Sequence, residues 1–235
     1  MKKNNLTEVQ KKADKDLNII VIATIVFVIL YVLVKDGLME FGESQDTNIW
    51  FRFFPVMFLQ YGLAGLGSTI VFFYRKEKLK DYGVNKNNLI KTILLSAFVC
   101  IPAFIFMYAN QEVTSYLPLQ GCFFTRQFLS MGFPNNAVGY LLIMLSWGFF
   151  EGMNYVVVSK KINERYPGKN KWLNYGAIAC GILCILIHGM IGFDLYSILE
   201  AVTTFIIIYG MLIIKDETDN AWGCILIFFL FWNAV

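Results

Sequence analysis

The segment Ser146-Trp147-Gly148-Phe149-Phe150-Glu151-Gly152-Met153-Asn154-Tyr155 places an acidic residue inside an apolar run that begins near Ala137. The length of this run predicts a membrane-spanning helix. A carboxylate at the centre of such a helix costs about 2.5–3.5 kcal/mol on insertion scales, so it usually faces the bundle interior and marks a functional site. Asn154 and Tyr155 follow Glu151 at the i+3 and i+4 positions and share its helix face. We therefore predict a site at Glu151 that Asn154 and Tyr155 support.

The composition excludes an ordinary soluble domain. Of the 235 residues, 57% are hydrophobic and only 16% are charged, which is typical of a chain with several membrane spans. The sequence contains no Gly-rich phosphate loop, no nucleic-acid motif and no G-x-S-x-G elbow, so we expect neither a cofactor nor a nucleic-acid partner. Four of the five cysteines fall in predicted spans, and we interpret them as small packing residues.

The hydropathy pattern predicts an all-α polytopic bundle with about seven spans, within a range of six to eight. Residues 1–16 form a polar tail, and residues 17–235 form a single integral-membrane domain. The connection 110–134 mixes Phe with polar residues and suits an interfacial or re-entrant segment. The predicted spans are 17–34, 49–74, 89–109, 137–159, 172–191, 194–214 and a short apolar tail at 221–235, with an acidic loop at 35–48 between the first two.

The distribution of basic residues predicts the orientation. With the N-terminus in the cytoplasm, the cytoplasmic segments carry 17 of the 20 Lys and Arg residues, and the outer segments carry the other three. This asymmetry follows the positive-inside rule.

Three further polar residues fall at a depth similar to that of Glu151. Counting from the ends of the predicted helices at ~1.5 Å per residue places His188 level with Glu151 on the next helix, and Glu200 and Asn233 at comparable heights. Each also has a structural interpretation. A lone intramembrane His or Asn often bonds a neighbouring helix, and Glu200 lies nearer the outer half of the membrane.

A Glu–His pair suits peptide hydrolysis. The carboxylate of Glu151, acting with His188, would activate a water for attack on a peptide carbonyl, and the Asn233 amide would donate a hydrogen bond to the oxyanion. Metal binding remains an alternative, although the spacing lacks an H-E-x-x-H motif.

These residues resemble the CPBP family of intramembrane proteases, which includes CAAX-type prenyl-protein proteases and bacteriocin-processing or immunity proteins. Glu151 stands where the family motif E-E-x-x-x-R begins, His188 where F-x-x-x-H ends, and Asn233 where H-x-x-x-N ends. Shorter similarities at 78–84 and 218–222 extend the resemblance over about residues 75–235. It implies a prokaryotic plasma membrane and a peptide or lipidated-peptide substrate.

The chain departs from the family pattern at four positions. Gly152 replaces the second Glu, Val156 the Arg, Cys184 the Phe and Phe229 the last His. Loss of one oxyanion donor typically costs about 10²–10³ in turnover. Two alternatives therefore stay open beside an active peptidase: a degenerate homologue that binds peptide or lipidated segments, as in bacteriocin self-immunity, and a small transporter.

Overall fold

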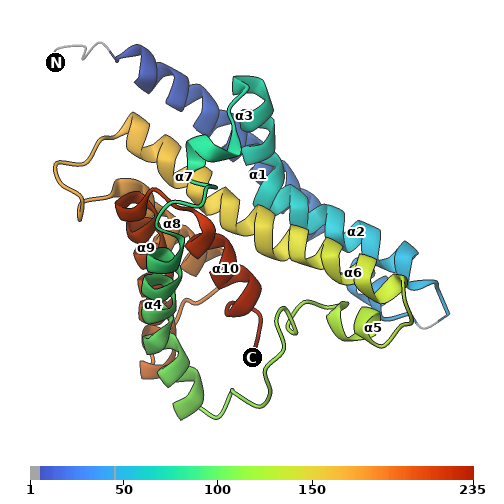
Figure 1. Ribbon diagram of the computed structural model, residues 1–235. Helices are drawn as coiled ribbons and strands as arrows, with labels where there is room; N and C mark the ends of the chain where they lie inside the picture. Colours follow the sequence, from blue (N-terminus) through green and yellow to red (C-terminus); the bar gives the residue numbers. More distant parts are fainter. Residues whose placement is uncertain (1–5, 45) are drawn as a thin grey trace.

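A computed structural model describes residues 6–44 and 46–235, and this part of the chain contains only helices and loops. Figure 1 shows the arrangement. The helices are α1 (Glu8–Glu43), α2 (Ile49–Tyr61), the π-helix η1 (Gly62–Leu66), α3 (Gly67–Arg75), the 3-10 helix η2 (Leu79–Tyr82), α4 (Leu89–Ala109), α5 (Thr125–Leu129), α6 (Asn135–Ile143), the π-helix η3 (Met144–Phe150), α7 (Glu151–Arg165), α8 (Tyr175–Ile187), α9 (Leu195–Thr218) and α10 (Trp222–Leu230).

Within residues 6–44 and 46–235, five continuous helices are long and apolar enough to cross a membrane, which confirms an all-α integral-membrane protein. They are α1, Ile49–Arg75, α4, Asn135–Arg165 and α9, where the second and fourth each contain a π-helical segment. The fifth predicted span, 172–191, contains the 13-residue α8, and the tail contains the nine-residue α10. Both are shorter than the ~20 residues that a full crossing needs.

The first helix extends well beyond its predicted bounds of 17–34. It begins at Glu8, in the predicted polar tail, because Thr7 and Gln10 form a capping box there. It continues to Glu43, so the predicted loop at 35–48 is much shorter. The buried guanidinium of Arg52 donates a hydrogen bond to the carbonyl of Gly42 near this end. A change in hydropathy therefore marks the end of the apolar span rather than the end of the helix.

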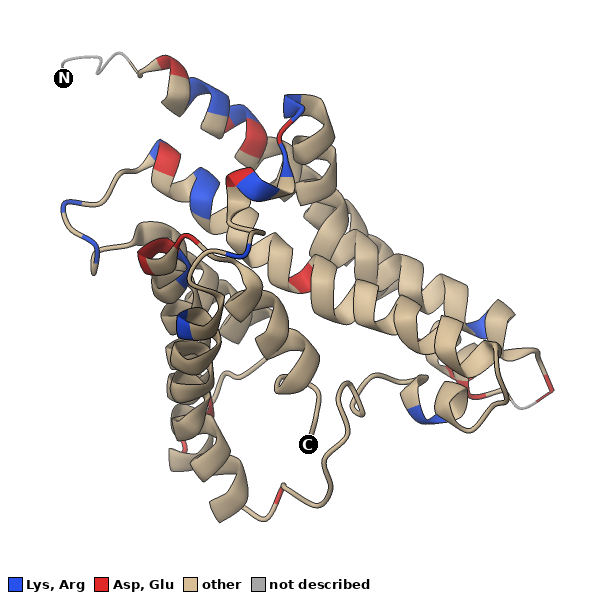
Figure 2. Cartoon of the chain, in the orientation of Figure 1, with Lys and Arg blue, Asp and Glu red and all other residues tan. Residues whose placement is uncertain are grey.

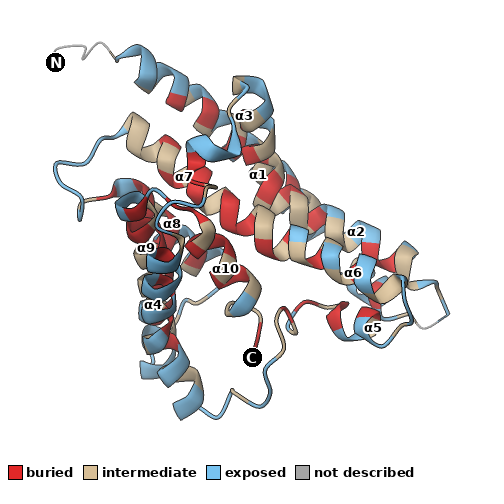
Figure 3. Cartoon of the chain, viewed as in Figure 1, coloured by how far each residue is buried: buried red, intermediate tan, exposed pale blue. Residues whose placement is uncertain are grey.

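The helices form two groups that α7 joins. In Figure 1, α1, α2 and α6 run side by side, while α4, α8, α9 and α10 form a second group. Helix α7 packs against α1 on one side and against α8 and α10 on the other, and α10 also packs against α4. The buried residues in Figure 3 follow these contact faces, whereas α1 and α4 present long exposed faces that suit contact with lipid.

Close packing of η3 and α7 against α10 depends on two glycines. Gly148 and Gly152 form a G-x-x-x-G pair, and such pairs let membrane helices approach each other closely. A Cβ atom on Gly152 would lie 2.9 Å from Ile225 Cα and 3.1 Å from the Cys224 carbonyl oxygen, and both are backbone atoms. Gly152 thus brings α10 against α7.

We expect Gly152→Ala to lower the free energy of unfolding by about 1–3 kcal/mol, because the new methyl group forces two backbones apart. Gly37→Ala in α1 is the matched control, since nothing lies within 4 Å of a Cβ there. Thermal unfolding of the detergent-solubilised protein measures both variants. Equal melting temperatures for the two variants would contradict the tight α7–α10 contact.

One end of the bundle, which we call the basic end, carries the Lys- and Arg-rich segments 75–91 and 160–171 (Figure 2). A buried charge network ties three helices together there. Lys161 of α7 lies 3.2 Å from a carboxylate oxygen of Asp16 in α1 and 2.7 Å from one of Glu77, while Arg75 of α3 lies 2.7 Å from Asp16. Burial raises the pKa of Glu77, but hydrogen bonds from Lys161 and Tyr82 outweigh it, so this pKa lies below its usual value.

The opposite end, which we call the far end, is closed by aromatic packing. Phe53 of α2 and Phe128 of α5 contact each other with ring centroids 4.9 Å apart. The connection 110–134 contains only the short α5 as an α-helix. The backbone of this connection also bonds the residues that follow α10, because the Leu117 amide donates a hydrogen bond of 3.1 Å to the Ala234 carbonyl. The connection therefore lies against both helix groups at this end.

Candidate functional site

Glu151 lies at the centre of the bundle and is only 7% exposed. Its Oε2 atom accepts a hydrogen bond of 3.0 Å from Gln60 Nε2. Gln60 stands just before the π-helix η1, and Glu151 follows directly after the π-helix η3. Such π-helical segments occur frequently at functional sites. Sequence reasoning missed Gln60 as a partner, although a lone amide inside a span was the available signal.

Asn154 and Tyr155 diverge from Glu151 rather than supporting it directly. Asn154 accepts a hydrogen bond from the Ser68 hydroxyl of α3, on the side that faces the first helix group. Tyr155 faces the second group, where its ring stacks on Phe228 with centroids 5.4 Å apart. The carbonyl of Tyr155 also accepts from Cys180 Sγ at 3.7 Å, which places these levels of α7 and α8 side by side.

His188 lies near the depth of Glu151, but the two side chains form no hydrogen bond or ion pair. Glu151 lies four residues before Tyr155 on α7, which is about 6 Å closer to the far end. His188 lies eight residues after Cys180 on α8, which is about 12 Å closer to the same end. The two residues therefore differ by about 6 Å in height. The His188 imidazole, at the end of α8, packs edge-on against Trp232 with centroids 5.7 Å apart.

The end of α10 reaches this neighbourhood through Phe229 and Trp232. The Phe229 ring lies directly against Gly148, one turn before Glu151. Asn233 lies beside Gly121 of the connection 110–134, where its carbonyl accepts from the Gly121 amide at 2.9 Å. Asn233 is the next residue after Trp232, which contacts His188. The side chain of Asn233 lies beside Gly121.

Glu200 stands apart from these residues, in the second turn of α9. Its backbone carbonyl accepts from the Thr203 hydroxyl at 3.0 Å, and within the described residues its carboxylate makes no hydrogen bond. In the same part of the chain, no group of three or more His, Cys, Asp or Glu side chains has the geometry to hold a metal ion.

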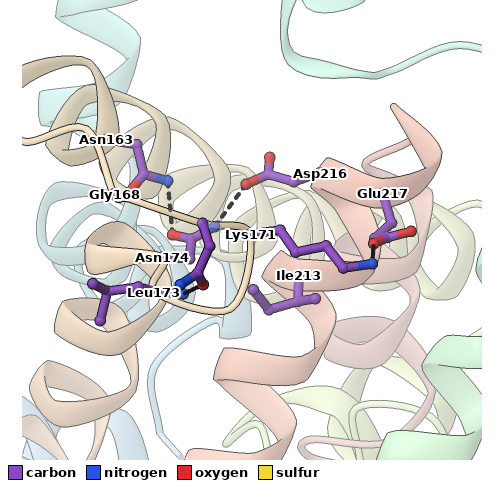
Figure 4. A pocket seen from close by; sticks show the side chains of 9 residues that line it. Asn163, Gly168, Lys171, Leu173, Asn174, Ile213, Asp216 and Glu217 are labelled. Carbon is purple, nitrogen blue, oxygen red and sulfur yellow. Dashed lines mark hydrogen bonds and ion pairs between the residues drawn. The ribbon is translucent and has the colours of Figure 1, made fainter.

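A separate polar cavity of about 320 Å³ opens at the basic end, between the α7–α8 turn and the end of α9 (Figure 4). Its side chains bond one another. Asn163 donates to Asn174, Asn174 donates to Asp216, both at 2.7 Å, and Lys171 pairs with Glu217. Because these groups already have partners, we interpret them as a structural link between α7, α8 and α9.

A scan against protein-family models and searches of curated proteins and solved structures found no match to this chain. The class of protein therefore follows from the fold and the site alone. It is an integral-membrane helical protein with a buried carboxylate, oriented by an amide, at the junction of its two helix groups.

Proposed function

We propose that this protein is a glutamate-type intramembrane endopeptidase of the CPBP type. Glu151 serves as the general base, His188 as its partner and Asn233 as an oxyanion donor. The observation that carries the proposal is the state of the Glu151 carboxylate. Gln60 holds Oε2, whereas Oε1 has no hydrogen-bond partner among the described residues and is not fully enclosed. An oriented carboxylate with one open oxygen suits proton abstraction from a water.

In the proposed reaction, Glu151 Oε1 takes a proton from a water whose oxygen attacks the scissile peptide carbonyl. The tetrahedral oxyanion accepts a hydrogen bond from the Asn233 amide. Glu151 then gives this proton to the departing amide nitrogen as the C–N bond breaks, while His188 acts as its partner by a hydrogen bond to the attacking water. Because no direct bond joins Glu151 to His188, the water and the substrate carbonyl lie between them in this scheme.

The substrate class follows from the location of the site. A catalytic carboxylate inside the bundle meets segments that enter from the bilayer, so we propose a peptide or lipidated peptide as substrate. The proposal includes a cytoplasmic N-terminus, because 17 of the 20 Lys and Arg residues then lie on the cytoplasmic side. It also includes a prokaryotic plasma membrane, which rests on the family resemblance.

A second candidate is a homologue that binds such segments without cutting them. It is favoured by Phe229, whose ring fills the space beside Gly148 where the family's last His would stand. It also agrees with Gly152, which packs against the α10 backbone instead of carrying the second acidic group.

Phe229→His separates the two candidates. The full chain is reconstituted in liposomes with quenched-fluorescent peptides, some farnesylated at a C-terminal CAAX sequence and some carrying a plain apolar segment. We expect weak cleavage by the unaltered protein and a rise of up to about 10² in rate with Phe229→His, because the imidazole supplies an oxyanion donor.

Phe229→Leu is the matched control, since it removes the ring without adding a donor, and its cleavage rate should stay close to that of the unaltered protein. If no variant cleaves while all of them bind the peptides, the peptidase is excluded and the binding protein is supported.

A further inference from the structure

The chain between α3 and the first turn of α4, residues 76–91, which we call the basic segment, is bonded to the rest of the bundle along its length. The side chain of Tyr82 is fully buried. The Ala221 amide donates a hydrogen bond of 2.8 Å to the Gly83 carbonyl, and the Asn220 side chain donates to two further carbonyls of the segment. Because these bonds fix the backbone, the segment presents its outward side chains in a fixed arrangement.

The outward side chains include five exposed lysines that form no ion pair with any other described residue. They are Lys76, Lys78, Lys80, Lys86 and Lys91. In contrast, Lys161, Arg165 and Lys171 at the same end of the bundle each pair with a carboxylate. The segment contains only two acidic residues, Glu77 and Asp81, and Glu77 already pairs with Lys161. The basic segment therefore carries positive charge that the fold does not neutralise.

The basic segment lies at the edge of the hydrocarbon. It joins two spanning helices, one that ends at Arg75 and one that begins at Leu89. Residues 76–88 therefore fall in the polar layer of the membrane, which is about 5–8 Å thick on each side of the hydrocarbon. Leu79 and Ile90 remain 41% and 75% exposed among the lysines. This combination of ammonium groups and apolar side chains suits a surface that contacts lipid headgroups and the upper part of the acyl chains.

We propose that the basic segment binds the phosphate groups of anionic phospholipids in the leaflet at the basic end of the bundle. Clusters of four to eight basic residues directly beside a spanning helix attract anionic headgroups. A soluble acidic protein or a nucleic acid would match the charge of the lysines, but it would leave Leu79 and Ile90 without an apolar environment. This lipid-binding surface lies outside the bundle interior that holds Glu151, so the proposal does not depend on peptidase activity.

Photochemical cross-linking tests the proposal. The full chain, with p-benzoylphenylalanine in place of Leu79, is reconstituted in vesicles that contain equal amounts of phosphatidylglycerol and phosphatidylcholine with the same acyl chains. The mass of each adduct identifies the lipid. We expect phosphatidylglycerol adducts to exceed phosphatidylcholine adducts by about fivefold or more, the preference that one lysine near the membrane surface gives. The same photoreactive residue in place of Phe193, which is 98% exposed and precedes Asp194, is the control and should show no excess of phosphatidylglycerol.

Charge variants show whether the lysines cause this preference. Lys78→Gln combined with Lys80→Gln should bring the adduct ratio at position 79 close to one. Lys169→Gln combined with Lys171→Gln removes the same charge from the exposed α7–α8 turn and should preserve the ratio. Sodium chloride at about 1 M should lower the ratio at position 79, because it shortens the screening length to about 3 Å.

Equal yields of the two lipid adducts at position 79, or a ratio that Lys78→Gln with Lys80→Gln leaves unchanged, would overturn the proposal. A ratio that falls with millimolar inorganic phosphate, but not with chloride at the same ionic strength, would indicate a site for free phosphate and would also overturn it. So would a cross-link from position 79 to a polypeptide or a nucleic acid, in place of lipid, in membranes of the expressing cells.

Discussion

Glu151→Gln is expected to lower the cleavage rate by about 10²–10⁴, the range that a positioned general base typically contributes. The amide has the size of the carboxylate but cannot accept the proton from water. The hydrogen bond to Gln60 can still form, and the cost of burying a carboxylate disappears. Expression and thermal stability should therefore equal or slightly exceed those of the unaltered protein, and peptide binding should remain.

The liposome cleavage assay measures this loss of rate. Two further single variants, one at a control position and one at the proposed partner of Glu151, show whether the loss is specific. Glu200→Gln changes an acidic residue that lies apart from Glu151 and should leave the rate unaltered. His188→Ala should reduce the rate to a similar level, and the double variant with Glu151→Gln should be little slower, because groups that act as a unit give non-additive losses. Full cleavage activity in Glu151→Gln would refute its role as the base.

Lys161→Met is expected to lower the free energy of unfolding by about 3–5 kcal/mol, the range for removing one partner of a buried ion pair. The Lys161 side chain is 3% exposed, and its partner Asp16 is 2% exposed. Removal of the ammonium leaves the Asp16 carboxylate with Arg75 as its remaining cation and deprives Glu77 of its closest one. The contact between α1 and α7 at the basic end should then loosen.

Denaturant titration in mixed micelles measures this change. Lys171→Met is the matched control, because Lys171 is 59% exposed and pairs with Glu217 at the surface. Such a pair contributes less than about 1 kcal/mol. Asp16→Asn combined with Lys161→Met should recover part of the loss, since the uncompensated charge is removed. Equal stabilities for Lys161→Met and Lys171→Met would show that the network does not hold the helices together.

Much of the fold was predictable because hydropathy reports burial in lipid directly. The third span, 89–109, matches α4 residue for residue, whereas the fourth, predicted as 137–159, continues as a helix to Arg165. Helix ends outside the hydrocarbon were less predictable. Beyond Val34, local capping and the Arg52 contact, rather than hydropathy, decide where α1 ends.

The sequence alone identified Glu151 as the central residue, because a carboxylate within a span is costly wherever it points. It also placed His188 near the same depth, because helical rise is constant. Which side chains meet depends on the rotation of each helix about its axis, and only the packing of the bundle settles that. The fold therefore decided that Gln60 bonds Glu151, that Trp232 packs edge-on against His188, and that Gly152 faces the α10 backbone.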